Sequence, residues 1–128
     1  MSGEELLEEA KKTLNNLLVD DTIYTVLYVE YDYRAEVKFL ITGNKSDIME
    51  RLFAKHMSMI IEVMKVARYV RERRKIDAKP FVMCKMSDYD MYDEHSVKEM
   101  EYDAETGRYG CDHITIIDTG IKLNNKGE

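Results

Sequence analysis

Residues Thr22–Thr42 read TIYTVLYVEYDYRAEVKFLIT and set the fold of this chain. The first half, residues 22–31, is rich in β-branched and aromatic residues on both alternating faces, which is typical of a central strand covered on both sides. Tyr31–Arg34 reads as a turn, and from Ala35 to Ile41 apolar residues alternate with polar ones, the mark of a strand with one solvated face. The stretch therefore predicts a β-hairpin.

Helix-start signals lie on both sides of this hairpin. Ser2 and Glu5 have the spacing of a capping box, and the apolar residues that follow recur at helical spacing as far as about Leu18. After the hairpin, either Asn44 or Ser46 has a side chain suited to capping a second helix. We therefore expect a helix before the hairpin and another directly after it.

The second helical segment is the longest predicted element. It runs from about Asp47 to Lys75 without Gly or Pro, and it is apolar over most of its circumference near the middle. Its seam at helical spacing comprises Met49, Phe53, His56, Ile60, Val63, Ala67 and Val70. A helix on one sheet needs only part of its surface apolar, so the excess must be covered by the first helix, by another chain, or by both. We expect a homo-oligomer that self-associates through Met57, Ile60, Ile61 and Met64.

The remaining chain predicts three more strands and a tail. Pro80 opens a short strand at 80–86, since proline is tolerated at the start of a strand. Further strands are expected at about 97–102 and 108–118, and a flexible tail at about 120–128. The predicted fold is a single α+β domain over 1–128, of order α-β-β-α-β-β-β, with a mostly antiparallel five-stranded sheet packed against a long central helix.

This order of elements resembles that of the roadblock dimerisation modules, which have a long central helix and form homodimers. It is similar in part to the order in profilin-like domains. The resemblance lies in element order alone, and the final helix common in roadblock domains has no counterpart in the sequence after Asp118. What it implies is an architecture, and a function does not follow from it.

The composition narrows the class of protein. The 128 residues contain no apolar run long enough to span a membrane, and the acidic N-terminus does not resemble a secretory signal. Two cysteines and nine methionines suit a reducing compartment, so we expect a cytoplasmic protein without a membrane partner. The net charge of −6 argues against direct binding of duplex nucleic acid, which depends on Lys and Arg contacts to phosphates.

Charge is divided along the chain. Residues 65–79 contain seven basic and two acidic residues, a net charge of +5, whereas residues 87–106 contain one basic and eight acidic residues, a net charge of −7. The basic residues lie at the C-terminal end of the long helix, where they suit the helix dipole. They also form a candidate site for an anion or a nucleotide, composed of Arg68, Arg71, Arg74 and Lys75.

The acidic stretch begins SDYDMYDEH at Ser87–His95. Tyrosine buries apolar area at low entropic cost while carboxylates steer and select a basic partner, so the pattern suits a protein-binding surface as well as it suits a solubilising loop. The expected contact residues are Asp88, Tyr89, Asp90, Tyr92, Asp93 and Glu94. In composition the chain resembles small acidic inhibitors of restriction and CRISPR enzymes, whose carboxylates occupy a nucleic-acid groove. We expect a non-enzymatic interaction protein, with a small-ligand binding protein as the alternative.

A metal-dependent enzyme ranks third. A calcium loop beginning at Asp88 would need glycine at the sixth position, where Asp93 stands. A transition-metal site drawn from Cys84, Cys111 and His113, with His56 or His95 added, lacks the paired spacing of known sites, and these residues suit core packing. We therefore expect no metal, no cofactor and no catalytic residue.

Overall fold

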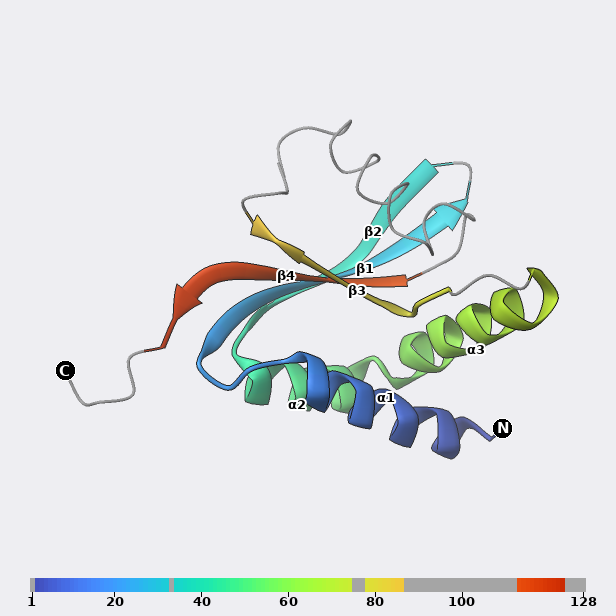
Figure 1. Ribbon diagram of the computed structural model, residues 1–128, viewed down its shortest axis with the longest axis horizontal. Helices are drawn as coiled ribbons and strands as arrows, with labels where there is room; N and C mark the ends of the chain where they lie inside the picture. The colour runs from blue at the N-terminus through green and yellow to red at the C-terminus, as the bar shows by residue number, and fades with distance from the viewer. Residues whose placement is uncertain (1, 33, 75–77, 87–112, 124–128) are drawn as a thin grey trace.

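The computed structural model describes residues 2–32, 34–74, 78–86 and 113–123. Along the chain its elements are α1 (Gly3–Leu17), β1 (Thr22–Asp32), β2 (Arg34–Gly43), α2 (Lys45–Lys55), α3 (Met57–Arg74), β3 (Phe81–Lys85) and β4 (His113–Lys122). The strands of this part of the chain form one sheet, and the helices lie against one of its faces (Figure 1). The predicted α+β class is confirmed.

The hairpin forms as the sequence predicts. β1 and β2 pair in antiparallel fashion, and β4 pairs with the other side of β1 in the sheet order β2-β1-β4-β3. Tyr24 and Val26 of β1 belong to the core between the sheet and the helices. Thr25 and Leu27, which point to the opposite face of the sheet, are buried as well. The prediction of a central strand covered on both faces is therefore confirmed.

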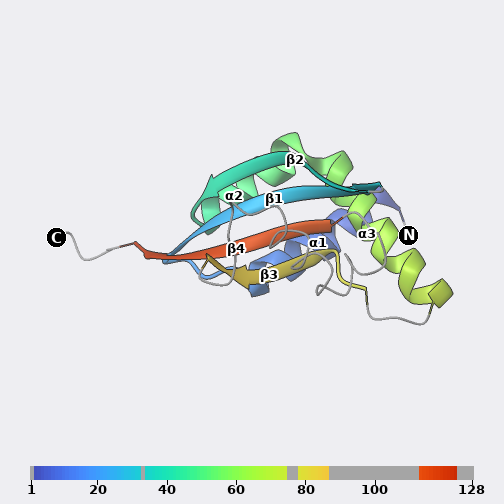
Figure 2. The same cartoon turned by 90° about the horizontal axis from the view of Figure 1, so that it is seen from above.

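β3 corrects the predicted strand arrangement. It pairs with β4 in parallel, from Phe81 opposite Ile114 to Lys85 opposite Asp118 (Figure 2). The described sheet is therefore mixed, with two antiparallel pairings and one parallel pairing, so the predicted antiparallel character is met in part. Parallel neighbours need a crossover connection of about a dozen residues or more. The chain between Lys85 and His113 is long enough to provide it. The fifth strand, expected at 97–102, lies outside the described residues.

β4 extends further than expected. It continues through Ile121 to Lys122, past the start of the tail that the sequence suggested at about residue 120. Gly120 makes this extension possible, because its φ of +78° is a conformation that favours glycine and its N–H donates to Asp118 Oδ1 at 2.8 Å. The end of the strand is held to the start of β1, where the Leu123 N–H donates to the Asp21 carbonyl at 2.6 Å.

The predicted helix caps are present. The Ser2 hydroxyl accepts from the Glu5 N–H, and the Ser2 N–H donates to the Glu5 carboxylate, both at 3.2 Å. Hydrogen bonds from Ser2 hold the pKa of Glu5 below its ordinary value, the backbone N–H contributing most. At the start of α2, Asn44 is the cap rather than Ser46, since its side chain accepts from the Asp47 N–H at 2.9 Å.

The prediction of one long central helix is wrong, because the helical segment is divided at His56 into α2 and α3. The backbone of His56 has φ −125° and ψ 25°; its N–H donates to the Leu52 carbonyl, and its carbonyl accepts from the Ile60 N–H, both at 3.0 Å. One unbroken helix of this length would span roughly 45 Å, more than the roughly 35 Å of the longest strand. The break lets Leu52 and Ile60, on the two helices, reach the same core.

The core lies between the helices and the sheet. Leu6, Ala10 and Leu14 of α1 are buried in one cluster with Ile48 of α2 and Val63 of α3. α1 therefore covers part of the apolar excess of the central segment, one of the two covers expected from the sequence. None of the helices in the described part of the chain is long and apolar enough to cross a membrane.

Lys45 joins the start of α2 to the end of α1. Its Nζ donates to the Asn15 carbonyl at 2.9 Å and lies 4.0 Å from an Asp20 carboxylate oxygen. α1 has no basic residue in its own last turn, so Lys45 supplies the positive charge that suits the C-terminal end of the helix dipole.

Lys45→Met is expected to lower the free energy of unfolding by about 1 kcal/mol, because it removes a charged hydrogen bond at a helix terminus. The measurement is urea unfolding followed by circular dichroism. Lys12→Met, on the exposed face of α1, is the control and is expected to stay within about 0.5 kcal/mol of the original protein. Equal losses in the two variants would contradict the proposed role of Lys45.

Candidate functional site

The predicted partner-binding residues, Asp88, Tyr89, Asp90, Tyr92, Asp93 and Glu94, lie outside the described residues. The structure does describe the strands to which this acidic segment, residues 87–112, is joined. The chain leaves β3 after Lys85 and enters β4 at His113. Because the two strands are parallel, these points lie at opposite ends of the strand pair. The acidic segment is thus attached at both ends to the sheet.

The negative charge of the protein resides in the acidic segment. The described residues contain fifteen basic and fourteen acidic side chains, a net charge of +1. Residues 87–112 contain two basic and nine acidic side chains, a net charge of −7. The described part of the chain is therefore nearly neutral, and residues 87–112 account for the overall charge of −6.

Acidic side chains compensate part of the candidate anion site at the end of α3. Arg68 and Arg71 line a hollow of about 260 Å³ between α1 and α3, together with Leu6, Glu9, Met64 and Glu72. Arg68 Nε lies 3.1 Å from Glu72 Oε1, so one guanidinium is already matched by a carboxylate. Of the other predicted members, Arg74 ends α3 and Lys75 is outside the described residues. The hollow therefore offers an anion little net attraction.

The predicted self-association residues do not form one surface. Ile60 and Met64 are 0% and 3% exposed and belong to the core, where they have no access to a second chain. Met57 is 45% exposed. Ile61 is half-buried beside α1, so close that a Cβ on Gly3 would lie 3.3 Å from Ile61 Cδ1. Because α1 and the sheet pack against α3, some of the four predicted self-association residues are buried and others are exposed.

A stripe on the outer side of α3 was not recognised in the sequence. Lys65, Tyr69 and Arg73 are spaced four residues apart and are all exposed, Tyr69 by 60%. The Arg73 guanidinium lies 5.6 Å from the centre of the Tyr69 ring, within the range of a cation–π interaction. The spacing was visible in the sequence, but Tyr69 belongs neither to the predicted seam nor to the candidate anion site, so the stripe was missed.

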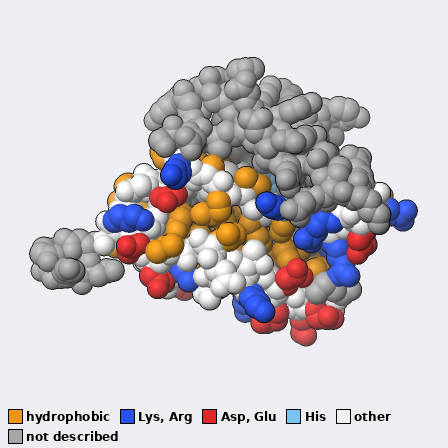
Figure 3. Space-filling model, in the orientation of Figure 1, with side chains coloured by type: hydrophobic (Ala, Val, Ile, Leu, Met, Phe, Trp, Pro, Cys, Tyr) orange, Lys and Arg blue, Asp and Glu red, His pale blue; other side chains and the backbone are white. Residues whose placement is uncertain are grey.

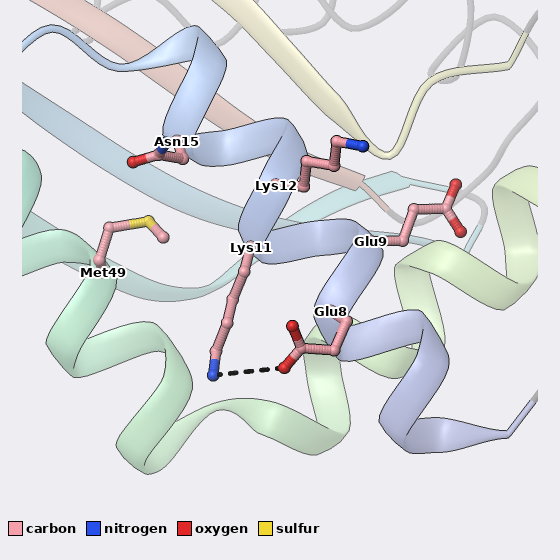
Figure 4. Close-up of a pocket in the computed structure, with 6 residues that line it drawn as sticks. All are labelled: Glu8, Glu9, Lys11, Lys12, Asn15 and Met49. Carbon is pink, nitrogen blue, oxygen red and sulfur yellow. Dashed lines mark ion pairs between the residues drawn. The ribbon is translucent and has the colours of Figure 1, made fainter.

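A second hollow lies open on the outer surface of α1 and α2. It has a volume of about 680 Å³ and is lined by Glu8, Glu9, Lys11, Lys12, Asn15 and Met49 (Figure 4). Lys11 lies 3.9 Å from the Glu8 carboxylate and 5.4 Å from the centre of the Phe53 ring. Two acidic and two basic side chains balance one another here, so the hollow has no marked preference for a charged ligand.

The candidate metal ligands on the sheet are far apart. Cys84 pairs with Ile117, which is four residues along β4 from His113, so the two side chains share a face at a separation of roughly 13 Å. Metal ligands must lie about 2.0–2.3 Å from one ion. Within the described residues no group of three His, Cys, Asp or Glu side chains could hold a metal. Cys111 and His95 lie outside that part of the chain.

The two described histidines of the candidate metal site, His113 and His56, lie in different environments. His113 is fully buried at the start of β4. His56 stands at the junction of α2 and α3, where burial first and the neighbouring Lys55 ammonium second hold its pKa below the ordinary value. Burial and the nearby ammonium thus favour the neutral imidazole of His56 over its charged form.

The surface is thus defined by charge layout more than by any concave site. Figure 3 shows one face of the molecule, on which basic and acidic side chains are interspersed around a hydrophobic band. Comparison of the chain with protein-family models, with curated proteins and with solved structures finds no match in any of the three.

Proposed function

We propose that this protein is a non-enzymatic interaction protein whose acidic segment binds a basic protein partner. The observation that carries the proposal is the division of charge, −7 in residues 87–112 against +1 in the described body. A charge concentrated in one segment steers association toward a basic surface far better than the same charge spread evenly. The contact residues we propose are Asp88, Tyr89, Asp90, Tyr92, Asp93 and Glu94.

The partner class that fits this chemistry is a nucleic-acid-processing protein, such as a restriction or CRISPR enzyme, which the acidic segment would inhibit. Such proteins present Lys and Arg side chains along a groove that binds phosphates. Closely spaced carboxylates occupy that groove, and Tyr89 and Tyr92 add apolar contact area. We also propose a cytoplasmic location, because two cysteines and nine methionines suit a reducing compartment.

Neutralising Asp88, Asp90, Asp93 and Glu94 as Asn, Asn, Asn and Gln is expected to slow association with a basic nucleic-acid-binding protein by about tenfold or more at low salt. The probe is a linker histone, and the measurement is stopped-flow association across a salt series. The variant should also show a flatter dependence of the rate on salt, and it should compete less well with duplex DNA for the histone.

The matched control neutralises four exposed acids of the body, Glu8, Glu9, Glu50 and Glu62, each to Gln. It changes the net charge by the same amount and leaves the acidic segment intact, so we expect it to retain most of the association rate. If the two variants lose the same rate, net charge alone governs binding, and the proposed role of the acidic segment is wrong.

A further inference from the structure

The outer stripe of α3, formed by Lys65, Tyr69 and Arg73, points away from the sheet. The buried residues by which α3 packs into the protein interior are Ile60, Val63, Met64, Ala67 and Val70. Residues four apart lie on one side of a helix, and the stripe falls on the side opposite to these buried residues. In Figure 1 α3 begins beneath the sheet, and its C-terminal end extends past the ends of the strands.

The chemistry of the stripe suits an acidic polypeptide. Residues 65–74 contain five basic side chains and one acidic side chain, a net charge of +4 on one helix end. Arg68 is matched by Glu72, whereas Arg73 lies beside the exposed ring of Tyr69 and Lys65 is exposed one helical turn before it. Tyrosine and arginine are enriched among the residues that contribute most to binding at protein interfaces. The positive charges of the stripe select a negatively charged partner.

We infer that the outer stripe of α3 binds the acidic segment of a second copy of this chain. That segment, residues 87–112, carries a charge of −7 and contains tyrosines of its own, so it complements the stripe in both charge and aromatic character. Within one chain the acidic segment is attached to the sheet at Lys85 and His113. The complementation test below separates a segment supplied by another molecule from one supplied by the same chain.

This inference rests on the proposed function in one respect, that the acidic segment is the binding element of the protein. It adds a consequence for regulation. A basic partner and the α3 stripe would compete for the same carboxylates, so self-association and partner binding would exclude one another. Binding of the partner would then dissociate the self-assembled protein by mass action.

The first test is sedimentation velocity of the full chain over a concentration series. We expect association at about 50 mM salt that weakens at about 500 mM, because exposed charges are screened over a few ångströms at high salt. Lys65→Glu with Tyr69→Ala and Arg73→Glu, the stripe variant, should weaken self-association by about tenfold or more. A matched control, Lys12→Glu with Val19→Ala and Arg51→Glu, alters equally exposed residues on other elements and should associate as the original protein does.

The second test is complementation between variants. The stripe variant and the variant with Asp88, Asp90, Asp93 and Glu94 neutralised should each remain monomeric alone. Mixed together they should form a one-to-one complex, because one supplies an intact acidic segment and the other an intact stripe. A monomer at every concentration and salt, an equal loss in the control, or no complex in the mixture would overturn the inference.

The linker-histone probe separates the two ideas. The stripe variant should bind the histone at least as well as the original protein, whereas the neutralised variant should lose both histone binding and self-association. If the original protein self-associates through the stripe but does not bind the histone, the proposed function is wrong and the inference about α3 stands. If the stripe variant still self-associates normally, the inference is wrong, whatever the histone result.

Discussion

Replacing Ile60 with alanine is expected to lower the free energy of unfolding by about 3 kcal/mol, because Ile60 is completely buried between α3 and the sheet. Removing three carbons from a packed interior costs both the transfer free energy and the cavity that remains. The measurement is urea denaturation with the midpoint and slope fitted together. Met57, three residues earlier on the same helix and 45% exposed, is the matched control, for which Met57→Ala should cost less than about 1 kcal/mol.

The comparison separates two interpretations of the apolar segment. If Ile60 contacted a second chain, its replacement would weaken association and leave the stability of the monomer nearly unchanged. If it belongs to the core, its replacement lowers stability at any protein concentration. An unchanged urea midpoint for Ile60→Ala would contradict the packing of α3 described above.

Phe81→Ala is expected to lower the free energy of unfolding by about 3–4 kcal/mol. Phe81 is 5% exposed and is the one residue of β3 in the main buried core cluster, where it anchors this edge strand beside β4. Met83, two residues along the same strand, is 38% exposed, so Met83→Ala should cost less than about 1 kcal/mol. Thermal or urea unfolding of the two variants provides the measurement.

Hydrogen exchange adds a local test of the same anchor. In Phe81→Ala the amides of β3 should exchange faster, while those of β1 and β2 should keep most of their relative protection, because they pair with each other and not with β3. Uniform loss of protection across all strands would show that β3 is an integral part of the core instead. Since the acidic segment follows β3 directly, the result also shows how firmly one end of that segment is attached.

Elements with strong local patterns were predicted well. The hairpin of β1 and β2, the capping box at Ser2 and the central position of β1 all follow from residues close together in the chain. Each depends on an alternation, a helical spacing or a cap, which neighbouring residues decide among themselves. The predicted contact residues of the acidic segment remain a prediction, because they lie outside the described residues.

The errors concern arrangements that residues far apart decide. His56 carries no Gly or Pro signal, yet the helix breaks there because both halves must lie against one sheet. β3 is parallel to β4, so the chain has to return from one end of the strand pair to the other between Lys85 and His113. Neither the length of the sheet nor the direction of that return can be predicted from the spacing of apolar and polar residues along a short stretch of sequence.

The sequence by itself determined the division of charge and the positions of the strands and helices near the hairpin, because both depend on residues that are neighbours in the chain. Only the tertiary structure decided which apolar residues of α3 form the core. Ile60 and Met57 are both apolar, and their burial differs because α1 and the sheet cover one side of the helix and leave another exposed. The same packing leaves Lys65, Tyr69 and Arg73 exposed on the outer side of α3, where they form one surface.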